Sequence, residues 1–587
     1  MPIEQLPIFC YFDVMRFRQF GSMDCANWYG IKIDSGKKEQ AMYPAMGRKH
    51  VTFMGQNKLI FDAEPRTIFK TIEFFYVIVG TRVFQYDRFY NSKLIGHVSL
   101  SGMIWQDFLP VDNLVYIMLT DETNIWIITE DGTSVTMQQV TDSNIPATPA
   151  YVAAFGNRFV VSDKDTPNYY LSVINLGGSS LNVGTCFTPA LFNRASGVVR
   201  QFAVLHSQLY ILCDYTTDIW ANIATQITVS GVTSEFPWKL NSSYNWDYGI
   251  QDPLSLSVDF GRMCWLAKNS NGLVAFMVSN GQQPQDFSSQ AINVLLENST
   301  SSTNDLSPFL EGNTEGFLYQ YENTLFYRVS AGEFFNFGIL DIEVRANAIE
   351  YNFETQTWAR VIELNGERNR IKKHVYFNNR HLVTLENDHA IYEMAGNIYH
   401  NEILNTARTS NQAANAFLKF PMRYELTTKQ LFLPDYAEFI DDYVEIDFVF
   451  GEKDFYKSNA PFANTVFIVS EESTPEVPVY MVTEDSTPGN ETFIIQDGTN
   501  TPAFDDNHYN ALFKPHIELF YSDDGGVTFE TADLREFSQL GQYRWRMRWY
   551  ELSASRNRCY QLICVSSAPI VILGAVRNTR RVSGGGN

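Results

Sequence analysis

The chain has 587 residues, and 66 Asp and Glu against 44 Lys and Arg give it a formal net charge of −22. A composition that is 45% hydrophobic and 14% aromatic excludes an intrinsically disordered protein. Its apolar runs, of which Pro569–Val576 is typical, fall short of the ~20 residues that a membrane-spanning helix needs. The acidic balance disfavours general DNA binding, because phosphate contacts require Lys and Arg. We therefore expect a large globular protein.

The N-terminal residues and the cysteines bear on the compartment. Met1–Pro7 lacks the basic and apolar regions of a secretory signal. The seven cysteines are odd in number, contain no CxxC pair and are thinly spread, as is typical of buried thiols in a reduced compartment. We expect synthesis in a cytoplasm, without structural disulfides. Residues 1–65 are expected to be an N-terminal segment that packs on the domain after it.

Short runs rich in Val, Ile, Tyr, Phe and Trp alternate with turn residues along most of the chain, which indicates an all-β protein. Seven strand–turn–strand units recur at intervals of roughly 40–60 residues, a pattern typical of a β-propeller. These units are Phe74–Tyr86, Leu114–Ile128, Arg158–Ile174, Gln208–Trp220, Met263–Val278, Thr324–Tyr351 and His381–Glu393. We predict a propeller of six or seven blades over residues 66–425, with a run of β-sandwiches as the alternative.

Histidines and acids gather between residues 374 and 400 and could in principle hold a metal ion. They are His374, His381, His389 and His400, with Glu386 and Asp388. None has a spacing typical of a zinc site, and the segment has the pattern of a hairpin. The sequence also lacks GxSxG, HExxH and EF-hand motifs. We therefore expect no catalytic, cofactor-binding or metal-binding residues, and a protein that is not an enzyme.

Residues 426–587 are predicted to form a C-terminal β-sandwich-like domain, and they begin with a strongly acidic block. Residues 435–506 contain 17 acids and two lysines. Within this block, 460–505 hold three copies of a strand followed by a turn that ends in Thr-Pro: Val466–Pro475, Val479–Pro488 and Thr492–Pro502. We interpret them as an inserted β-meander. The acidic block is expected to be a solvated surface or one that repels DNA or binds a basic partner.

One specific motif follows the acidic block. Residues 522–529 fit S-x-D-x-G-x-T-aromatic, the Asp-box of sialidases and other propellers. Its residues are Ser522, Asp524, Gly526, Thr528 and Phe529. The Asp side chain is expected to bind the backbone amides of the turn, Gly supplies an unusual φ, and the aromatic ring anchors the hairpin. The predicted role is structural.

An arginine-rich block closes the chain. Residues 542–581 carry eight arginines and a single acid, Glu551. Because Arg is enriched at protein interfaces and Lys is not, we interpret this block as a subunit interface, with a plain surface as the alternative. The candidate assembly residues are Arg544, Arg546, Arg548, Trp549, Arg556 and Arg558.

Both ends of the chain resemble the tail nozzle, or tail hub, proteins of short-tailed bacteriophages of the Salmonella podovirus type. The opening Met1–Pro7 is similar to the start of that family. The family's closing pattern is similar to Leu519–Gly526, Tyr543–Trp549, Ala554–Arg558 and Ala568–Ala575. These segments correspond to an Asp-box hairpin, an Arg/Trp strand, an Arg-rich turn and a final strand after a proline.

The resemblance implies a virion tail protein, assembled in the host cytoplasm as a ring, typically of six copies, below the portal and its adaptor ring. Such a ring extends the DNA channel, retains the packaged genome and supports tail fibres or spikes. Residues 1–65 would then pack on the propeller or on the adaptor ring, and the arginine block would contact other subunits or the adaptor. The charge of −22 predicts a channel wall that DNA passes without tight binding. The Asp-box leaves a phage glycan-binding or sialidase-like depolymerase propeller as the alternative.

Overall fold

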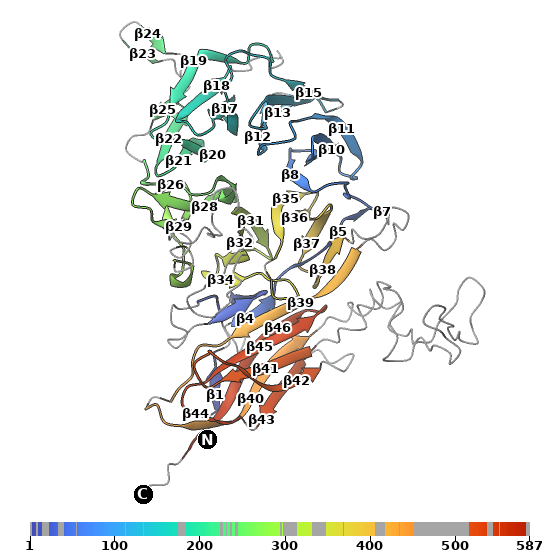
Figure 1. Ribbon diagram of the computed structural model, residues 1–587, viewed down its shortest axis with the longest axis vertical. Helices are drawn as coiled ribbons and strands as arrows, with labels where there is room; N and C mark the ends of the chain where they lie inside the picture. Colours follow the sequence, from blue (N-terminus) through green and yellow to red (C-terminus); the bar gives the residue numbers. More distant parts are fainter. Residues whose placement is uncertain are drawn as a thin grey trace, which may run out of the picture. The chain divides into compact units, whose positions relative to one another are not determined.

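The computed structural model describes most of the chain in two compact units (Figure 1). The described residues are 3–7, 10–13, 23–32, 40–53, 56–111, 113–132, 134–173, 183–222, 227–229, 232–234, 238–240, 245–293, 296, 314–331, 348–367, 369–404, 417–433, 435–450, 516–536, 544–550 and 552–582. The predicted acidic insertion at 460–505 lies outside them. The first unit comprises Met1–Cys10, Asn27–Arg48 and Asn397–Asn587, and the second comprises Tyr11–Ala26 and Lys49–Gly396.

The second unit contains seven sheets, each built on an antiparallel run of strands that follow one another along the chain. The first sheet contains β8 (Pro65–Lys70), β9 (Phe75–Val79), β10 (Arg82–Tyr86) and β11 (Ser92–His97). The second contains β12 (Trp105–Val111), β13 (Leu114–Thr120), β14 (Ile125–Glu130) and β15 (Val135–Gln139). The third contains β16 (Pro149–Phe155), β17 (Arg158–Asp163), β18 (Asn168–Ser172) and β19 (Phe187–Arg194). The fourth contains β20 (Val199–Leu205), β21 (Gln208–Cys213), β22 (Thr217–Asn222) and β25 (Trp238–Leu240).

The remaining three sheets follow in chain order. The fifth contains β26 (Tyr248–Ile250), β27 (Ser257–Asp259), β28 (Arg262–Asn269), β29 (Val274–Ser279) and β30 (Gln285–Asp286). The sixth contains β31 (Glu315–Tyr321), β32 (Thr324–Ser330), β33 (Ala348–Asn352) and β34 (Thr357–Arg360), with β2 (Asp24–Ala26) parallel to β34. The seventh contains β35 (Ile371–Phe377), β36 (Arg380–Leu385) and β37 (Ile391–Ala395), and β5 (Gly47–His50) pairs beside β37 as its fourth strand. Short hairpins are formed by β6 (Thr52–Phe53) with β7 (Gln56–Asn57) and by β23 (Ile227–Val229) with β24 (Val232–Ser234).

The seven sheets are the blades of a β-propeller. Figure 1 shows them arranged around a common centre, and the first strand of the seventh sheet, β35, lies against the first strand of the first, β8. Buried side chains fill the space between successive blades. Phe69 and Tyr76 of the first blade pack with Ile117 and Leu119 of the second, for example. A single blade could not bury both of its faces, and the ring provides each with a neighbour.

The predicted all-β propeller is confirmed, with seven blades among the described residues. Each of the seven strand–turn–strand units corresponds to the second and third strands of one blade in the order in which the strands pair. Residues 332–347 of the unit Thr324–Tyr351 lie outside the described residues. The compact unit ends at Gly396, whereas we expected the propeller to continue to residue 425. Residues 1–65 are not one packed segment, because they supply strands to both units.

Two-residue hairpins connect the first and second strands of the last two blades. The turn residues Glu322 and Asn323 have φ of 47° and 66°, and Asn378 and Asn379 have φ of 50° and 59°. Two successive positive φ values are the signature of a type I′ turn, whose twist matches that of the flanking strands. Asn is among the residues that tolerate this conformation best, which explains its use here.

The first unit is a sandwich of two sheets, as predicted for the C-terminal domain. One sheet has the order β3-β4-β46-β40-β43, with β1 beside β46 and β44 beside β40. Its strands are β1 (Ile3–Leu6), β3 (Trp28–Lys32), β4 (Gln40–Pro44), β40 (Phe439–Phe450), β43 (Arg544–Tyr550), β44 (Ala554–Ser555) and β46 (Ile570–Arg581). The other contains β38 (His400–Leu404), β39 (Phe417–Thr427), β45 (Cys559–Ser566), β41 (His516–Ser522) and β42 (Glu530–Glu536), in that order.

Aromatic side chains join the two sheets of the sandwich. Trp28 of β3 is buried and stacks on Tyr424 of β39 with 5.3 Å between ring centroids. Trp549 of β43 is also buried, and its Nε1 donates to the carbonyl of Asp533 in β42 at 3.1 Å.

No helix among the described residues is long and apolar enough to cross a membrane.

Candidate functional site

The Asp-box forms the turn between β41 and β42 of the sandwich. The carboxylate of Asp524 accepts hydrogen bonds from the hydroxyls of Ser522 and Thr528, both at 2.6 Å, and from the amides of Val527 and Thr528, at 3.0 Å. Gly526 has a φ of 91°, and its amide donates to the Ser522 hydroxyl at 2.8 Å. Partial burial alone would raise the pKa of Asp524, but these hydrogen bonds lower it to about 2. The motif therefore stabilises its own turn and lies in the sandwich, outside the blades.

The arginine-rich strand β43 has two different faces. Met547 and Trp549 are buried, while the side chains of Arg544, Arg546 and Arg548 are 57%, 60% and 47% exposed. This alternation follows from the two-residue period of a strand. We refer to the exposed side chains of Arg544, Arg546 and Arg548 as the arginine face.

Two acids of the neighbouring strand β40 hold the arginine face. Arg544 binds Asp447 through two hydrogen bonds, from Nε at 3.0 Å and from Nη2 at 2.5 Å. Arg548 donates through Nε to Glu445, and Arg546 lies 4.0 Å from the same carboxylate. Glu445 pairs with Arg548, and Asp447 with Arg546, in the register of the two strands. Three cations therefore share two carboxylates.

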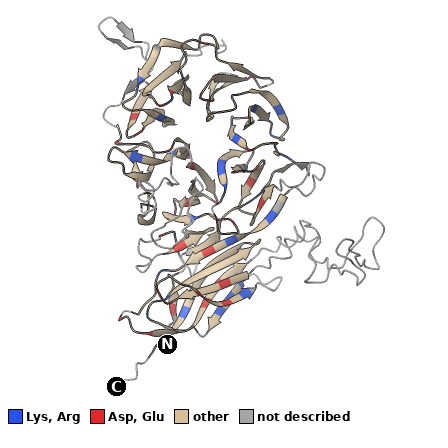
Figure 2. Ribbon diagram, viewed as in Figure 1, with Lys and Arg blue, Asp and Glu red and all other residues tan. Residues whose placement is uncertain are grey.

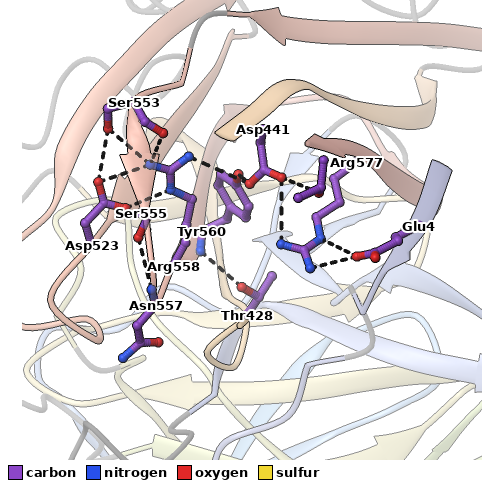
Figure 3. Close-up of polar contacts among 11 residues, drawn as sticks. Glu4, Thr428, Asp441, Asp523, Ser553, Ser555, Asn557, Arg558, Tyr560 and Arg577 are labelled. Atoms are coloured by element: carbon purple, nitrogen blue, oxygen red, sulfur yellow. Dashed lines mark hydrogen bonds and ion pairs between the residues drawn. The ribbon is translucent and has the colours of Figure 1, made fainter. Parts of the chain in front are cut away.

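A buried ionic network lies inside the sandwich (Figure 3). Asp441 is fully buried and accepts hydrogen bonds from Tyr560 and Thr579. The guanidinium groups of Arg558 and Arg577 both lie 3.7 Å from its carboxylate. The network continues outward at both ends. Arg558 binds Asp523, the neighbour of the Asp-box aspartate, at 2.8 and 3.0 Å, and Arg577 binds Glu4 at 3.1 and 2.7 Å.

The acidic block and the arginine block, which we predicted to be separate surfaces, partly neutralise each other. Figure 2 shows acidic and basic residues side by side on the strands of the sandwich. Acids at the start of the acidic block form ion pairs with arginines of the arginine block: Asp435 with Arg581, Asp441 with Arg558 and Arg577, Asp442 with Arg580, Glu445 with Arg546 and Arg548, and Asp447 with Arg544. These acids between residues 435 and 447 are therefore ion-paired within the chain, whereas residues 451–506 of the acidic block lie outside the described residues.

The predicted assembly residues divide into two groups. Arg544, Arg546, Arg548 and Arg556 are exposed and available to a partner. Trp549 and Arg558 are 1% and 0% exposed, so both hold the sandwich together and neither can contact another subunit in this fold. The sequence reasoning missed Glu4, Asp441, Asp523 and Arg577. Arg577 could have been noticed as one of the eight arginines of residues 542–581, but its partner Glu4 lies at the other end of the chain.

A second buried polar cluster lies between the sixth and seventh blades of the propeller. Arg328 and Glu350 form an ion pair at 2.7 Å with side chains that are 2% and 6% exposed. His374 stacks on Phe317 with 4.8 Å between centroids, and its Nε2 lies 3.0 Å from Nδ1 of His381. Burial lowers the pKa of both histidines, and the neighbouring ring of His381 lowers that of His374 further. Among the described residues, no group of three or more His, Cys, Asp or Glu is placed to hold a metal ion.

A cavity of about 590 Å³ lies at the centre of the propeller. Its wall includes Asp107, Lys372, Lys373, His374 and Glu315 from the first strands of the blades. Asp107 accepts hydrogen bonds from the amides of Phe108 and Ala154 at 2.8 and 2.7 Å. Burial raises its pKa to about 6 despite these bonds. Lys373 lies 3.3 Å from Glu315, so charges of both signs line the cavity.

No family model matches this sequence, and no curated protein matches it either. The solved structures that are similar include a streptogramin B lyase, at 8% identity and a TM-score of 0.31, covering 60% of this chain and 96% of its own. Virginiamycin B lyase from Staphylococcus aureus has 9% identity and a TM-score of 0.33, with coverage of 60% and 99%. The Pan2 WD40 domain of Neurospora crassa has 9% identity and a TM-score of 0.31, with coverage of 57% and 89%. We base the propeller assignment on the order of the strands and take no function from these similarities.

Proposed function

We propose that this chain is a structural virion protein that forms the tail nozzle, or tail hub, ring of a short-tailed bacteriophage. In this role, several copies, with six expected, extend the DNA channel below the portal and its adaptor proteins. The ring retains packaged DNA and anchors tail fibres or spikes. The protein has no enzymatic role in this proposal.

One structural relationship carries the proposal. The segments that resemble the nozzle family are dispersed at both ends of the sequence, yet they belong to a single unit, the sandwich. The N-terminal strand β1 pairs with the C-terminal strand β46 from Ile3↔Asn578 to Leu6↔Ala575. The Asp-box and the arginine-rich strand β43 belong to the same unit. The similar segments at the two ends of the sequence fold together in one unit, which supports a shared module with a shared role.

The charge of the chain supports the part of the proposal that concerns DNA. Arg558 and Arg577 of the sandwich are buried and bound to carboxylates, so they are not accessible to phosphate groups. The net charge of −22 per chain would accumulate around a ring. Because like charges repel the phosphate backbone, such a wall would let DNA slide instead of holding it.

The alternative, a glycan-binding or sialidase-like depolymerase, was suggested by the Asp-box. The side chains of the motif hydrogen-bond to one another within their own turn, which is the role expected of a structural element. We therefore favour the structural role. Incubation of the purified protein with bacterial surface polysaccharides, followed by measurement of reducing ends, distinguishes the two roles, since a depolymerase would release them.

Immunogold labelling tests the proposal. Antibodies raised against the purified chain should label the distal end of the tail in virions of the phage that encodes it. Negative-stain images of the isolated tail should show a symmetric ring with a central hole at the labelled position. Virions without label, or label on the capsid or on fibre tips alone, would contradict the proposal.

A further inference from the structure

We infer that the arginine face of β43 is a docking surface for the acidic repeats, residues 466–502, of a second copy of this chain. The inference rests on the proposed function, because a ring requires contacts between copies, and it names the two surfaces that would form one of these contacts. The sequence alone predicted an arginine-rich interface but did not identify the surface that it contacts.

The arginine face is fixed in position without being covered. Asp447 binds Arg544 through two hydrogen bonds, and Glu445 holds Arg548. Both carboxylates are largely buried, with side chains that are 10% and 12% exposed, whereas the guanidinium groups remain about half exposed. Each guanidinium has five N–H donors, so a bound carboxylate leaves donors for a second one. Side chains that are already ordered also lose less entropy when a partner binds.

Aromatic side chains border the arginine face. The guanidinium of Arg548 lies 4.9 Å from the ring centroid of Tyr443, which in turn lies 6.2 Å from the ring of Tyr550. Tyr550 is 57% exposed, although it is a large side chain. Arg and Tyr together are the residues most often found at the energetic centre of a protein interface. The combination indicates a protein partner.

The chain itself contains a segment with the complementary charge. Residues 466–502 include seven acids and no Lys or Arg. Adjacent acids recur at the interval of 13 residues, as Glu471-Glu472 and Glu484-Asp485. Paired carboxylates suit guanidinium groups, which bind two oxygens at once. Arg546 shares the carboxylate of Glu445 with Arg548 at 4.0 Å, so the face keeps an excess of one positive charge.

Nucleic acid fits this face less well. Tight binding to DNA needs several cations that follow the phosphate backbone, and affinity falls with each missing contact. The arginine face has three cations over two carboxylates, in a chain with a net charge of −22. An acidic protein segment needs charge complementarity only to these three arginines. Binding of DNA to the arginine face is one of the outcomes that the experiment below distinguishes.

Sedimentation velocity of the full chain and of two charge-reversed variants tests the inference. Variant A carries Arg546→Glu and Arg548→Glu, and variant B carries Glu471→Lys, Glu472→Lys, Glu484→Lys and Asp485→Lys. The wild-type chain should associate at tens of micromolar, more weakly at high salt. Each variant alone should associate at least about tenfold more weakly. A mixture of A and B should form a heterodimer, since A retains the acidic segment and B retains the arginine face.

Matched controls separate docking from misfolding. Arg535→Glu reverses an arginine of β42 that is 44% exposed and pairs with Asp533, and it should leave association unchanged. The single variant Arg546→Gln removes only the 4.0 Å contact to Glu445 and adds no negative charge opposite Asp447, so it should retain the wild-type melting temperature and still weaken association.

Three results would overturn the inference. They are a wild-type chain that stays monomeric, a mixture of A and B that stays monomeric, and a labelled DNA duplex that binds the wild-type chain but not variant A. The first two would exclude this contact between copies even if immunogold labelling placed the protein in the tail. Absence of label from virions, with the heterodimer formed, would instead contradict the proposed function alone.

Discussion

The carboxylate of Glu4 accepts two hydrogen bonds from the guanidinium of Arg577, which lies 573 residues later in the chain. Arg577 is 5% exposed, and its only other ionic partner among the described residues is Asp441, at 3.7 Å. This pair joins the N-terminal strand β1 to the C-terminal strand β46. It therefore connects the two ends of the chain that carry the resemblance to nozzle proteins.

Replacing Glu4 with Gln should weaken the attachment of β1. The substitution removes the charge that balances a buried guanidinium, and we expect a loss of about 1–2 kcal/mol in local stability. Hydrogen exchange of the peptide that contains residues 570–581 should become faster, because β1 pairs with Ala575–Asn578 of that strand. Gln5→Ala, at the adjacent exposed position, serves as the control and should change little. Equal protection in Glu4→Gln and in the wild type would show that β1 does not depend on the ion pair.

Arg558 should be among the most sensitive positions of the sandwich. It is fully buried, and Arg558→Met would leave Asp441 with a weaker set of partners and would remove both hydrogen bonds from the guanidinium to Asp523. Loss of one partner from a buried ionic network typically costs about 3–5 kcal/mol. Calorimetry should show a lower melting temperature for the transition of the sandwich. Arg556→Met, two residues away and exposed, should stay within about 0.5 kcal/mol of the wild type. Similar melting temperatures for the two variants would refute the structural role of the network.

The sequence predicted the propeller well because its signal is local. Phe75–Val79 and Arg82–Tyr86, for instance, are adjacent strands joined by a short turn, and short runs rich in Val, Ile, Tyr and Phe identify both. The fourth strand of the last blade was not predictable in the same way. It is β5, from the N-terminal part of the chain, and only the closed ring shows which sheet it joins.

The candidate site was predicted in part for a related physical reason. The charge runs were visible in the sequence, but their pairing was not. Asp447 and Arg544 are 97 residues apart and become neighbours only because β43 pairs with β40. Burial likewise distinguishes Arg558 from Arg556, although both belong to the same arginine-rich turn. Composition identifies a charged block, and strand order decides which of its members bind each other.

The Asp-box should become less stable in acid. The pKa of Asp524 is lowered to about 2 in the folded chain, below that of an unfolded Asp near 4. The stabilisation is therefore complete above pH ~4 and is lost as the pH falls toward ~2. The protection factors of the amides of Val527 and Thr528, the ratios of intrinsic to observed exchange rate at each pH, should fall over this range. In Asp524→Ala they should be low at every pH. Protection factors that do not change between pH ~4 and pH ~2 in the wild type would contradict the assigned hydrogen bonds.

Asp107, at the wall of the propeller cavity, should have the opposite effect on stability. Its folded pKa is raised to about 6, so the folded chain binds a proton between pH ~6 and ~4 that the unfolded chain does not yet bind. Acidification through this window therefore favours the folded state. The histidine pair opposes it, because lowered histidine pKa values make the folded state lose stability as the pH falls below ~6.5. Comparison with Asp107→Asn separates the two contributions. Relative to the wild type, this variant should melt about 2–4 °C higher at pH 7, and the difference should shrink toward pH 5. A difference that does not change between pH 7 and pH 5 would show that Asp107 does not titrate in this window.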